Sequence, residues 1–375
     1  MNNAIHIRQF ELNAVASARE YHCLLQVSDP LLPFEQQADA VIESIDQLLS
    51  GPYAQACPVF ARFFVSDATT QLPPITSRVS KHLNCALSFI QQPPLNGGKL
   101  AVWLYLLSDV TAQQLSSHST LITHGRFQHL WTTGLHTAVG DSEQQTLQVF
   151  NDYLQELAGI SCQLKDNCIR TWFYVNDIDY QYKGMVIGRN KVFDQQQLTN
   201  RTHFISSTGI GGRLTESSCR VVMDAYAVKG LQPEQIKFLY APHFLNRTSE
   251  YNVRFERGTM VTYGDRRQVY ISGTASIDNR GEVVWPGDIV HQTQRMRQNV
   301  EALLAEADMT FDDIGIMLVY LRDPSDEAIV RTLFEQHFPN RPYLIVWAPV
   351  CRPGWLIEME CMGVKAVTTT KFDLF

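Results

Sequence analysis

Two glutamates, Glu358 and Glu360, stand two residues apart in an otherwise apolar stretch near the C-terminus. Alternate residues of a β-strand point to the same face of a sheet, so we expect both carboxyl groups on one side. A carboxyl group among apolar side chains either pairs with a cation or has a raised pKa. Glu358 lies between Ile357 and Met359. We predict that Glu358 is a general acid that keeps its proton near neutral pH. A buried structural ion pair is the alternative, and it is favoured for Glu360.

One cysteine and several arginines have positions that suit a small anionic substrate. The guanidinium fork binds carboxylates with two parallel hydrogen bonds. Arg170 interrupts a predicted strand, Arg257 follows a polar segment, and Arg331 lies beside the apolar face of a predicted helix. We predict that these three bind substrate. The alternative for Arg257 is a surface salt bridge, and the alternative for Arg331 is a side chain that extends to solvent. Cys351 at a strand end is either a small buried hydrophobe or a reactive thiol whose pKa the neighbouring Arg352 lowers.

The composition excludes several classes of protein. The chain has 375 residues, a net charge of −7 and 18% charged residues, so it has no excess of the lysines and arginines that nucleic acids require. It has no apolar run of the roughly 18–20 residues that a membrane span needs, and no signal-peptide pattern at its start. Its eight cysteines form no CxxC pair. We therefore predict a soluble cytoplasmic protein with reduced thiols, without metal or cofactor.

A repeat links the middle and the end of the chain. The segments 166–177 (DNCIRTWFYVND) and 312–323 (DDIGIMLVYLRD) align without a gap. Each follows a helix-like stretch that begins with Gln-Thr, at 145–159 and 292–307, with apolar residues at three- and four-residue spacing. Chance similarity of two α/β segments is the alternative. The repeat predicts two copies of one module.

A fainter third copy lies at the N-terminus. Residues 38–49 match the helix and residues 57–67 match the strand that follows it. The predicted order in each copy is strand, strand, helix, strand, helix, strand, an α+β module. We place the modules at 1–120, 121–235 and 236–375. Three such modules in one chain predict a pseudo-trimeric barrel with outer helices, and a monomer, since the trimer surfaces are used internally.

The last strand of each module predicts a single active cleft. Alignment of these strands places Val222 opposite Glu358 and Asp224 opposite Glu360, and the N-terminal strand at 99–107 has no acid. A glutamate that the fold required would recur in each copy. Because Glu358 occurs once, we expect one catalytic cleft, formed by the third module and a neighbour.

The third module resembles the Rid (YjgF-type, reactive intermediate deaminase) family. The matching motifs are ISGTAS (271–276), VVWPGD (283–288), QT (292–293), VYLRD (319–323) and IEME (357–360). Rid proteins are trimers of a chorismate-mutase-like module with active sites at the clefts between subunits. The resemblance therefore implies a site at a module boundary.

The whole chain is similar to the chorismatases, which join a long N-terminal portion to a Rid-like module and remove pyruvate from chorismate. In members that form 3-hydroxybenzoate, a cysteine precedes the active-site glutamate by the spacing that separates Cys351 from Glu358. The motifs RTW at 170–172 and SSTGIGG at 206–212 also resemble this family. The resemblance implies that Gly273 and Cys351 together face the substrate ring.

Two segments differ from the patterns of these families. A chorismatase segment that contacts substrate corresponds to EYNVRFERG at 250–258, which is shorter but retains Tyr251 and Arg257 as substrate-binding residues. Rid deaminases have a substrate-binding arginine after a proline on the penultimate strand. Here Arg341 precedes Pro342.

The leading hypothesis is thus a cofactor-independent chorismatase. Chorismate carries a ring carboxylate and an enolpyruvyl ether with a second carboxylate, so its site needs cationic forks and an acid that protonates the enolpyruvyl methylene. The hydroxybenzoate isomer stays open, with 3-hydroxybenzoate favoured. One alternative is Rid-type hydrolysis of imines or enamines, and another is a metabolite-binding protein without turnover.

Overall fold

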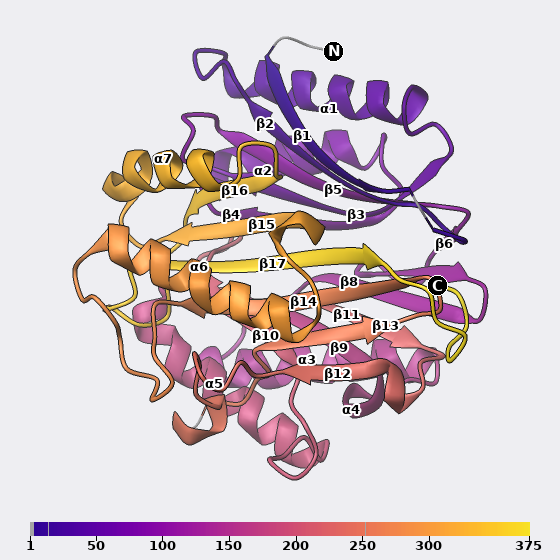
Figure 1. Ribbon diagram of the computed structural model, residues 1–375. Helices are drawn as coiled ribbons and strands as arrows, with labels where there is room; N and C mark the ends of the chain where they lie inside the picture. The colour runs from indigo at the N-terminus through magenta and orange to yellow at the C-terminus, as the bar shows by residue number, and fades with distance from the viewer. Residues whose placement is uncertain (1–3, 14, 252) are drawn as a thin grey trace.

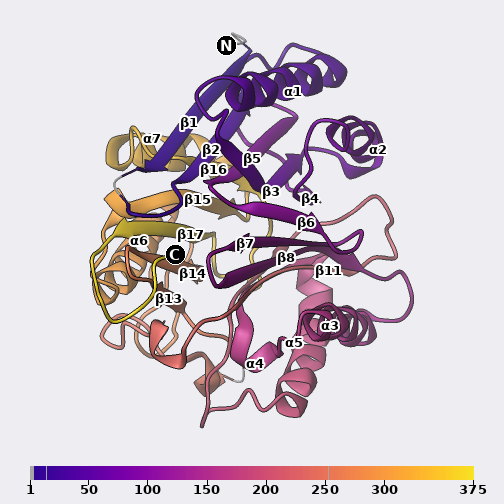
Figure 2. The same cartoon turned by 90° about the vertical axis from the view of Figure 1, so that its right-hand side faces the viewer.

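Three β-sheets with outer helices make up the protein (Figure 1). The computed structural model describes residues 4–13, 15–251 and 253–375, apart from the side chains of Ser249 and Tyr251. Figures 1 and 2 place the long helices outside the sheets, toward solvent. The protein thus has the α+β class and the three-module barrel that the repeats predict.

The first sheet and its helices come from the N-terminal part of the chain. The strands are β1 (Ile5–Leu12), β2 (Glu20–Val27), β3 (Ala56–Val65), β4 (Ala86–Gln91) and β5 (Leu100–Ser108), and the helices are α1 (Phe34–Ser50) and α2 (Ala68–Val79). Buried residues of α1 recur at helical spacing, among them Ala38, Val41, Ile45 and Leu48. The amphipathic α1 therefore covers the outer face of this sheet.

The second sheet follows directly. Its strands are β6 (Thr111–Gln114), β7 (Ser119–His124), β8 (Phe127–His136), β9 (Cys168–Val175), β10 (Ser206–Gly211) and β11 (Val221–Lys229). Its helices are α3 (Ser142–Gly159), the short α4 (Leu164–Asn167) and α5 (Ile178–Gln195). A capping box at Asp141 and Gln144 fixes the start of α3.

The third sheet uses the C-terminal part of the chain. Its strands are β12 (Ile236–Leu239), β13 (Gly258–Thr262), β14 (Arg266–Ala275), β15 (Ile314–Leu321), β16 (Tyr343–Trp347) and β17 (Ile357–Ala366). Its α-helices are α6 (Ile289–Glu306) and α7 (Glu327–His337). Short 3₁₀ turns η1 (Pro233–Gln235), η2 (Thr248–Tyr251), η3 (Phe311–Asp313) and η4 (Pro324–Asp326) connect them.

The three sheets share one strand order. It is β1-β2-β5-β3-β4 in the first, β7-β8-β11-β9-β10 in the second and β13-β14-β17-β15-β16 in the third, with β6 and β12 as extra edge strands. Only the pairs β3–β4, β9–β10 and β15–β16 are parallel among the described strands. The aligned repeats 166–177 and 312–323 contain β9 and β15, which have the same place in their sheets.

The structure corrects the predicted element order in one respect. Each module has a further short strand after its second helix, β4, β10 or β16. In β10 the sequence SSTGIG has glycines that are typical of a turn. They are needed in the strand, because a Cβ on Gly211 would lie 2.7 Å from the Cδ of Pro349 in the neighbouring module.

A buried glutamine gives each module the same internal brace. Gln37, Gln145 and Gln292 each lie near the start of the first long helix of their module and are fully buried. The side-chain oxygen of each accepts a hydrogen bond from the backbone just before the closing strand, at Lys99, Arg220 and Leu356. These bonds satisfy buried backbone groups and fix the entry to β5, β11 and β17.

The sheets pack around a common centre. β4 contacts β8, β10 contacts β14, and β15 contacts β1 and β2, so the three modules close into a ring. Large aromatic side chains of different sheets meet inside it: Phe60 lies 4.8 Å from Trp131, and Tyr226 lies 5.4 Å from Tyr270, measured between ring centroids. The chain passes from one sheet to the next after Ser108 and after Lys229. The predicted module boundaries at 120 and 235 stay predictions.

Candidate active site

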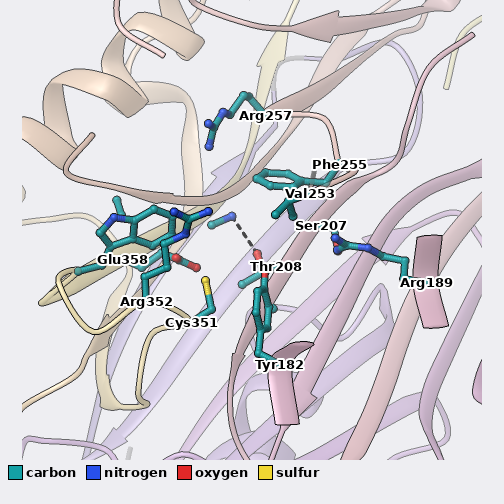
Figure 3. A pocket seen from close by; sticks show the side chains of 14 residues that line it. Tyr182, Arg189, Ser207, Thr208, Val253, Phe255, Arg257, Cys351, Arg352 and Glu358 are labelled. Carbon is teal, nitrogen blue, oxygen red and sulfur yellow. Dashed lines mark hydrogen bonds between the residues drawn. The ribbon is translucent and has the colours of Figure 1, made fainter. Parts of the chain in front are cut away.

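A small enclosed pocket lies between the second and third modules (Figure 3). The second module contributes side chains from α5 and β10, and the third contributes β14, β17 and the loop before β17. The cavity measures about 20 Å³. A second cavity of about 30 Å³ adjoins it, and Phe255 and Arg257 line both.

Glu358 is on β17 and faces this pocket. It is only 3% exposed and pairs in register with Ala275 and Tyr320 on the flanking strands. Its carboxyl group lies directly against Gly273, where a Cβ would come 2.0 Å from the Glu358 Oε1. Only glycine leaves room for this contact, so the structure brings together two residues that the sequence singled out separately.

The surroundings of Glu358 raise its pKa to about 8. Burial is the main cause, because it penalises the charged form, and the nearby carboxylate of Glu360 adds to it. Arg257 and Arg170 act in the opposite direction without cancelling these effects. The carboxyl group therefore carries its proton over most of the neutral range and can act as a general acid.

Cys351 lines the same pocket, and Figure 3 shows its sulfur directed toward Glu358. The Gly211 N–H donates to the Pro349 carbonyl over 2.9 Å and ties the cysteine loop to β10. Burial and the Glu358 charge raise the pKa of the thiol to about 12. Arg352 favours the thiolate, but its attraction is weaker than these two effects, so the surroundings favour the small buried side chain of the two alternatives. Cys351 thus lines the pocket with a small, protonated thiol.

Arg257 reaches the pocket from the segment that precedes β13. It is buried, and its guanidinium donates to the backbone oxygen of Asn246 over 3.2 Å and to the side-chain Oδ1 over 3.0 Å. The Glu256 N–H donates to the Ile205 carbonyl over 3.1 Å, which holds this segment on the second module. The side chain of Tyr251, the other residue predicted here, lies outside the described part of the structure.

Arg170 has a different place from the one predicted. Its side chain is buried behind the pocket, where Nη2 lies 2.5 Å from Glu360 Oε2 and also donates to Thr208. Nη1 donates to Ser272 over 3.3 Å. The guanidinium fork is thus engaged by protein groups, and Arg170 does not line the cavity. The structure supports an internal ion pair here rather than a contact with substrate.

Arg331 also lies away from the pocket. It is partly exposed on α7 and pairs with Glu327 one helical turn earlier. The i,i+4 partner holds the guanidinium on the helix surface. Its position gives no support to the predicted role in substrate binding. Arg341 is likewise remote and pairs with Asp312 over 2.7 Å.

Sequence reasoning missed several lining residues. Tyr182 and Arg189 come from α5, and Arg352 and Trp355 come from the loop before β17. The buried residues of α5 include Met185, Val192 and Phe193 together with Arg189. Arg189 lies on the apolar face of α5, just as Arg331 was predicted to lie beside the apolar face of α7. The same sequence pattern could therefore have indicated Arg189. The described residues contain no group of three or more His, Cys, Asp or Glu side chains placed to hold a metal ion.

Known proteins match the C-terminal part of the chain in sequence. The family model for Endoribonuclease L-PSP matches residues 258–365. A RutC family protein of Pyrococcus abyssi is 34% identical over 100 residues, which is 26% of this chain and 78% of that protein. The 3-aminoacrylate deaminase RutC of Acinetobacter baylyi is 29% identical over 97 residues, 25% of this chain and 77% of the relative.

One solved structure is similar over most of the chain. The crystal structure of a chorismatase superposes with a TM-score of 0.64 at 15% identity and covers 82% of this chain and 93% of the other. At this identity the similarity concerns the fold, which is chorismatase-like. In the described ranges, no helix combines the length and the apolar character that crossing a membrane requires.

Proposed function

The chain belongs to the RutC family, and on that premise we propose that the pocket at Glu358 is the active site of a chorismatase-like enzyme that removes pyruvate from chorismate. The observation that carries the proposal is a buried glutamic acid with a pKa of about 8 in a pocket that arginines line. The chorismatase-like fold supports the choice of substrate.

The chemistry needs one proton at the right carbon. Glu358 gives its proton to the methylene carbon of the enolpyruvyl group, and the carbon that bears the ether oxygen becomes electrophilic. For a hydroxybenzoate product the nucleophile is the ring hydroxyl next to the ether, which adds to that carbon. The ring then loses a C–H proton and one C–O bond as it becomes aromatic, the released oxygen takes that proton, and the adduct separates into pyruvate and the hydroxybenzoate. Glu358 regains a proton from the adding group, so the acid is restored at the end of each turnover.

The two carboxylates of chorismate need cationic partners. Arg257 and Arg189 line the pocket from opposite modules, one before β13 and one on α5 (Figure 3). Charge-assisted hydrogen bonds from guanidinium groups are stronger than neutral ones and orient planar carboxylates. We assign these two arginines to substrate binding, with Arg352 beside Trp355 at the other wall.

The pocket must open to admit this substrate. Binding sites for small molecules are typically on the order of 300 Å³ or more, whereas this cavity measures about 20 Å³. Because Phe255 and Arg257 line both cavities, an outward movement of these two side chains would join them. We therefore infer an induced fit that closes the site around the substrate.

The walls near the ring favour an aromatic product. Cys351 and Gly273 both line the pocket at Glu358, and neither carries a charged group at neutral pH. Their pairing resembles that of the 3-hydroxybenzoate-forming chorismatases. Loss of pyruvate with aromatisation of the ring gives a hydroxybenzoate and needs no further reactant, whereas capture by water gives a dihydroxy diene acid. We favour 3-hydroxybenzoate.

The test is to incubate the purified protein with chorismate, follow pyruvate with lactate dehydrogenase and NADH, and identify the ring product by chromatography against standards. We expect pyruvate and 3-hydroxybenzoate in equal amounts. General acid catalysis contributes about 10²–10⁴-fold, so Glu358→Gln should lower pyruvate release by at least about a hundredfold while chorismate still binds. Cys351→Ala should change the ratio of ring products more than the rate of pyruvate release.

The alternatives give different results in the same experiment. Turnover of 2-iminopropionate with chorismate left intact would replace the proposal by the deaminase activity that is named for the relative from Acinetobacter baylyi. Chorismate that binds, as measured by calorimetry, but is recovered unchanged would indicate a binding protein.

A further inference from the structure

Glu360 lies behind Glu358 in a polar cluster that is almost fully buried. Its carboxylate accepts hydrogen bonds from Arg170, from Thr208 and from the indole N–H of Trp172, the last over 2.9 Å. A carboxyl group that accepts from several donors, one of them a guanidinium, is favoured in its charged form. Glu360 is therefore held inside the barrel by three donors that suit a carboxylate.

Thr208 connects Glu360 to Gly273, which lines the pocket. Its hydroxyl donates to Glu360 and accepts from Arg170 and from the Gly273 N–H, the last over 3.0 Å. Gly273 is the residue against which the Glu358 carboxyl lies. The two glutamates, two residues apart on β17, are thus connected: Glu358 lies against Gly273, the Gly273 N–H donates to Thr208, and Thr208 donates to Glu360.

The second module has a cluster of the same kind without an acid beside it. Asp224 on β11 accepts from Arg62 over 3.0 Å, from Ser88 over 2.5 Å and from the Gly134 N–H over 2.7 Å. The position two residues before Asp224 is Val222, where the third module has Glu358. Both clusters brace an interface between modules, and Arg62 connects them, since its Nη1 also lies 3.9 Å from Glu360 Oε1. Of the two carboxyl groups, Glu360 is the one that shares a strand face with a titratable group of the pocket.

We propose that Glu360 is a positioning residue for Glu358: the Arg170–Thr208–Glu360 cluster fixes a negative charge beside the pocket and so keeps the Glu358 carboxyl in the form that donates a proton. This inference deepens the proposed function and assigns to the cluster a role in catalysis beyond bracing the module interface. Repulsion between like charges at short range in a poorly solvated site is strong enough for this role.

Other charged or titratable groups also surround Glu358. Arg257 faces it from the segment before β13, and Cys351 and Arg352 face it from the loop before β17. Tyr182 and Arg189 on α5 line the same pocket, and Tyr320 on β15 pairs in register with Glu358. Arg257, and Arg170 behind the pocket, favour the charged form of Glu358. Glu360, two residues along the same strand face, acts in the opposite direction and raises the pKa of Glu358.

The test is a titration of Glu358 by ¹³C NMR of the side-chain carboxyl carbons, on wild-type protein and on Glu360→Gln. Removing the charge should move the Glu358 midpoint down by about one pH unit or more. Asp224→Asn is the matched control, since it neutralises a buried carboxylate in the equivalent cluster. It should leave the Glu358 midpoint unchanged and have a comparable effect on folding stability.

The rate should follow the titration. If the Glu358 midpoint falls from about 8 to about 7, the protonated fraction at pH 8 falls about fivefold, and at pH 6 it hardly changes. Pyruvate release by Glu360→Gln should show the same loss at pH 8 and recover toward pH 6. In the wild type, the ¹³C shift of Glu360 should stay at the carboxylate value while Glu358 titrates, which tests the proposal even where Glu360→Gln fails to fold.

Three outcomes would overturn the inference: an unchanged Glu358 midpoint in Glu360→Gln, an equal shift in Asp224→Asn, or a proton on Glu360 in the wild type. A shifted midpoint in a protein that releases no pyruvate would refute the proposed function and leave the electrostatic role of Glu360 standing. The NMR readout therefore separates the two failures.

Discussion

Glu358 should make the protein less stable at alkaline pH, and Glu358→Gln should remove this weakness. The pKa of Glu358 rises from 4.5 to about 8 on folding, so the folded protein holds the proton more tightly than the unfolded chain. The associated stability is present in full below about pH 4.5 and is lost as pH rises through 8. Each pH unit in that window lowers the free energy of unfolding by about 1.4 kcal/mol, which gives an upper bound of roughly 5 kcal/mol.

A loss of this size is a large fraction of the 5–15 kcal/mol that typically stabilises a folded protein. We would measure urea unfolding by tryptophan fluorescence at pH 5 and pH 9. Glutamine mimics the protonated acid, so wild type and Glu358→Gln should have similar midpoints at pH 5, and the variant should be more stable at pH 9. Glu335→Gln, at an exposed position on α7, is the control and should follow the wild type at both pH values. Parallel pH dependence of wild type and Glu358→Gln would refute the assigned burial and charge of this group.

Two further predictions concern the walls of the pocket. Gly273→Ala should place a methyl group where the Glu358 carboxyl lies. It should lower pyruvate release by about a hundredfold or more and lower the free energy of unfolding by about 1–3 kcal/mol. Normal turnover would show that the carboxyl acts from another position. Arg257→Ala should raise KM for chorismate by about tenfold or more through loss of a charge-assisted hydrogen bond, while Arg331→Ala should leave KM unchanged, since its side chain pairs with Glu327 on α7. The reverse ranking in steady-state kinetics would favour the helix arginine as the substrate ligand.

The repeats made the architecture predictable. A module with its own core must repeat its apolar pattern, and the segments 166–177 and 312–323 do so because β9 and β15 are central strands with both faces buried. The short edge strands β4, β10 and β16 were not predicted. Five or six residues carry little periodicity, and the glycines of β10 serve contacts with another module that no local pattern reports.

The site was predictable where one residue breaks the repeat. Glu358 differs from the corresponding positions of the other modules, and it lines the pocket together with Cys351, which the resemblance to the chorismatases indicated. The roles of the arginines were harder to predict, because the role of a guanidinium depends on the group with which it pairs. The partner of Arg170 is Glu360, 190 positions along the chain, so its ion pair depends on how two modules meet. Arg189 was missed, although a buried arginine on the apolar face of α5 is the same kind of signal.

Fusion of three modules in one chain explains why only one cleft carries the acid. In a trimer of identical subunits, every interface must have the same residues. Here the position of Glu358 is taken by Val222 in the second module and by Ala101 in the first, opposite Tyr174 and Phe64. The equivalent strands can therefore differ in sequence, so that β17 carries the acid while β11 and β5 carry apolar residues that pack in the core.

The same freedom applies to the buried charges. Arg62 of the first module pairs with Asp224 of the second, and Arg170 of the second pairs with Glu360 of the third. A buried ion pair costs desolvation free energy and contributes little net stability compared with apolar packing. Its retention between the second and third modules is understandable if the Glu360 charge serves the acid beside it. Between the first and second modules, Val222 stands where the third module has Glu358, so the Arg62–Asp224 pair stabilises the interface and has no acid beside it. Asp224 is therefore the natural control for Glu360.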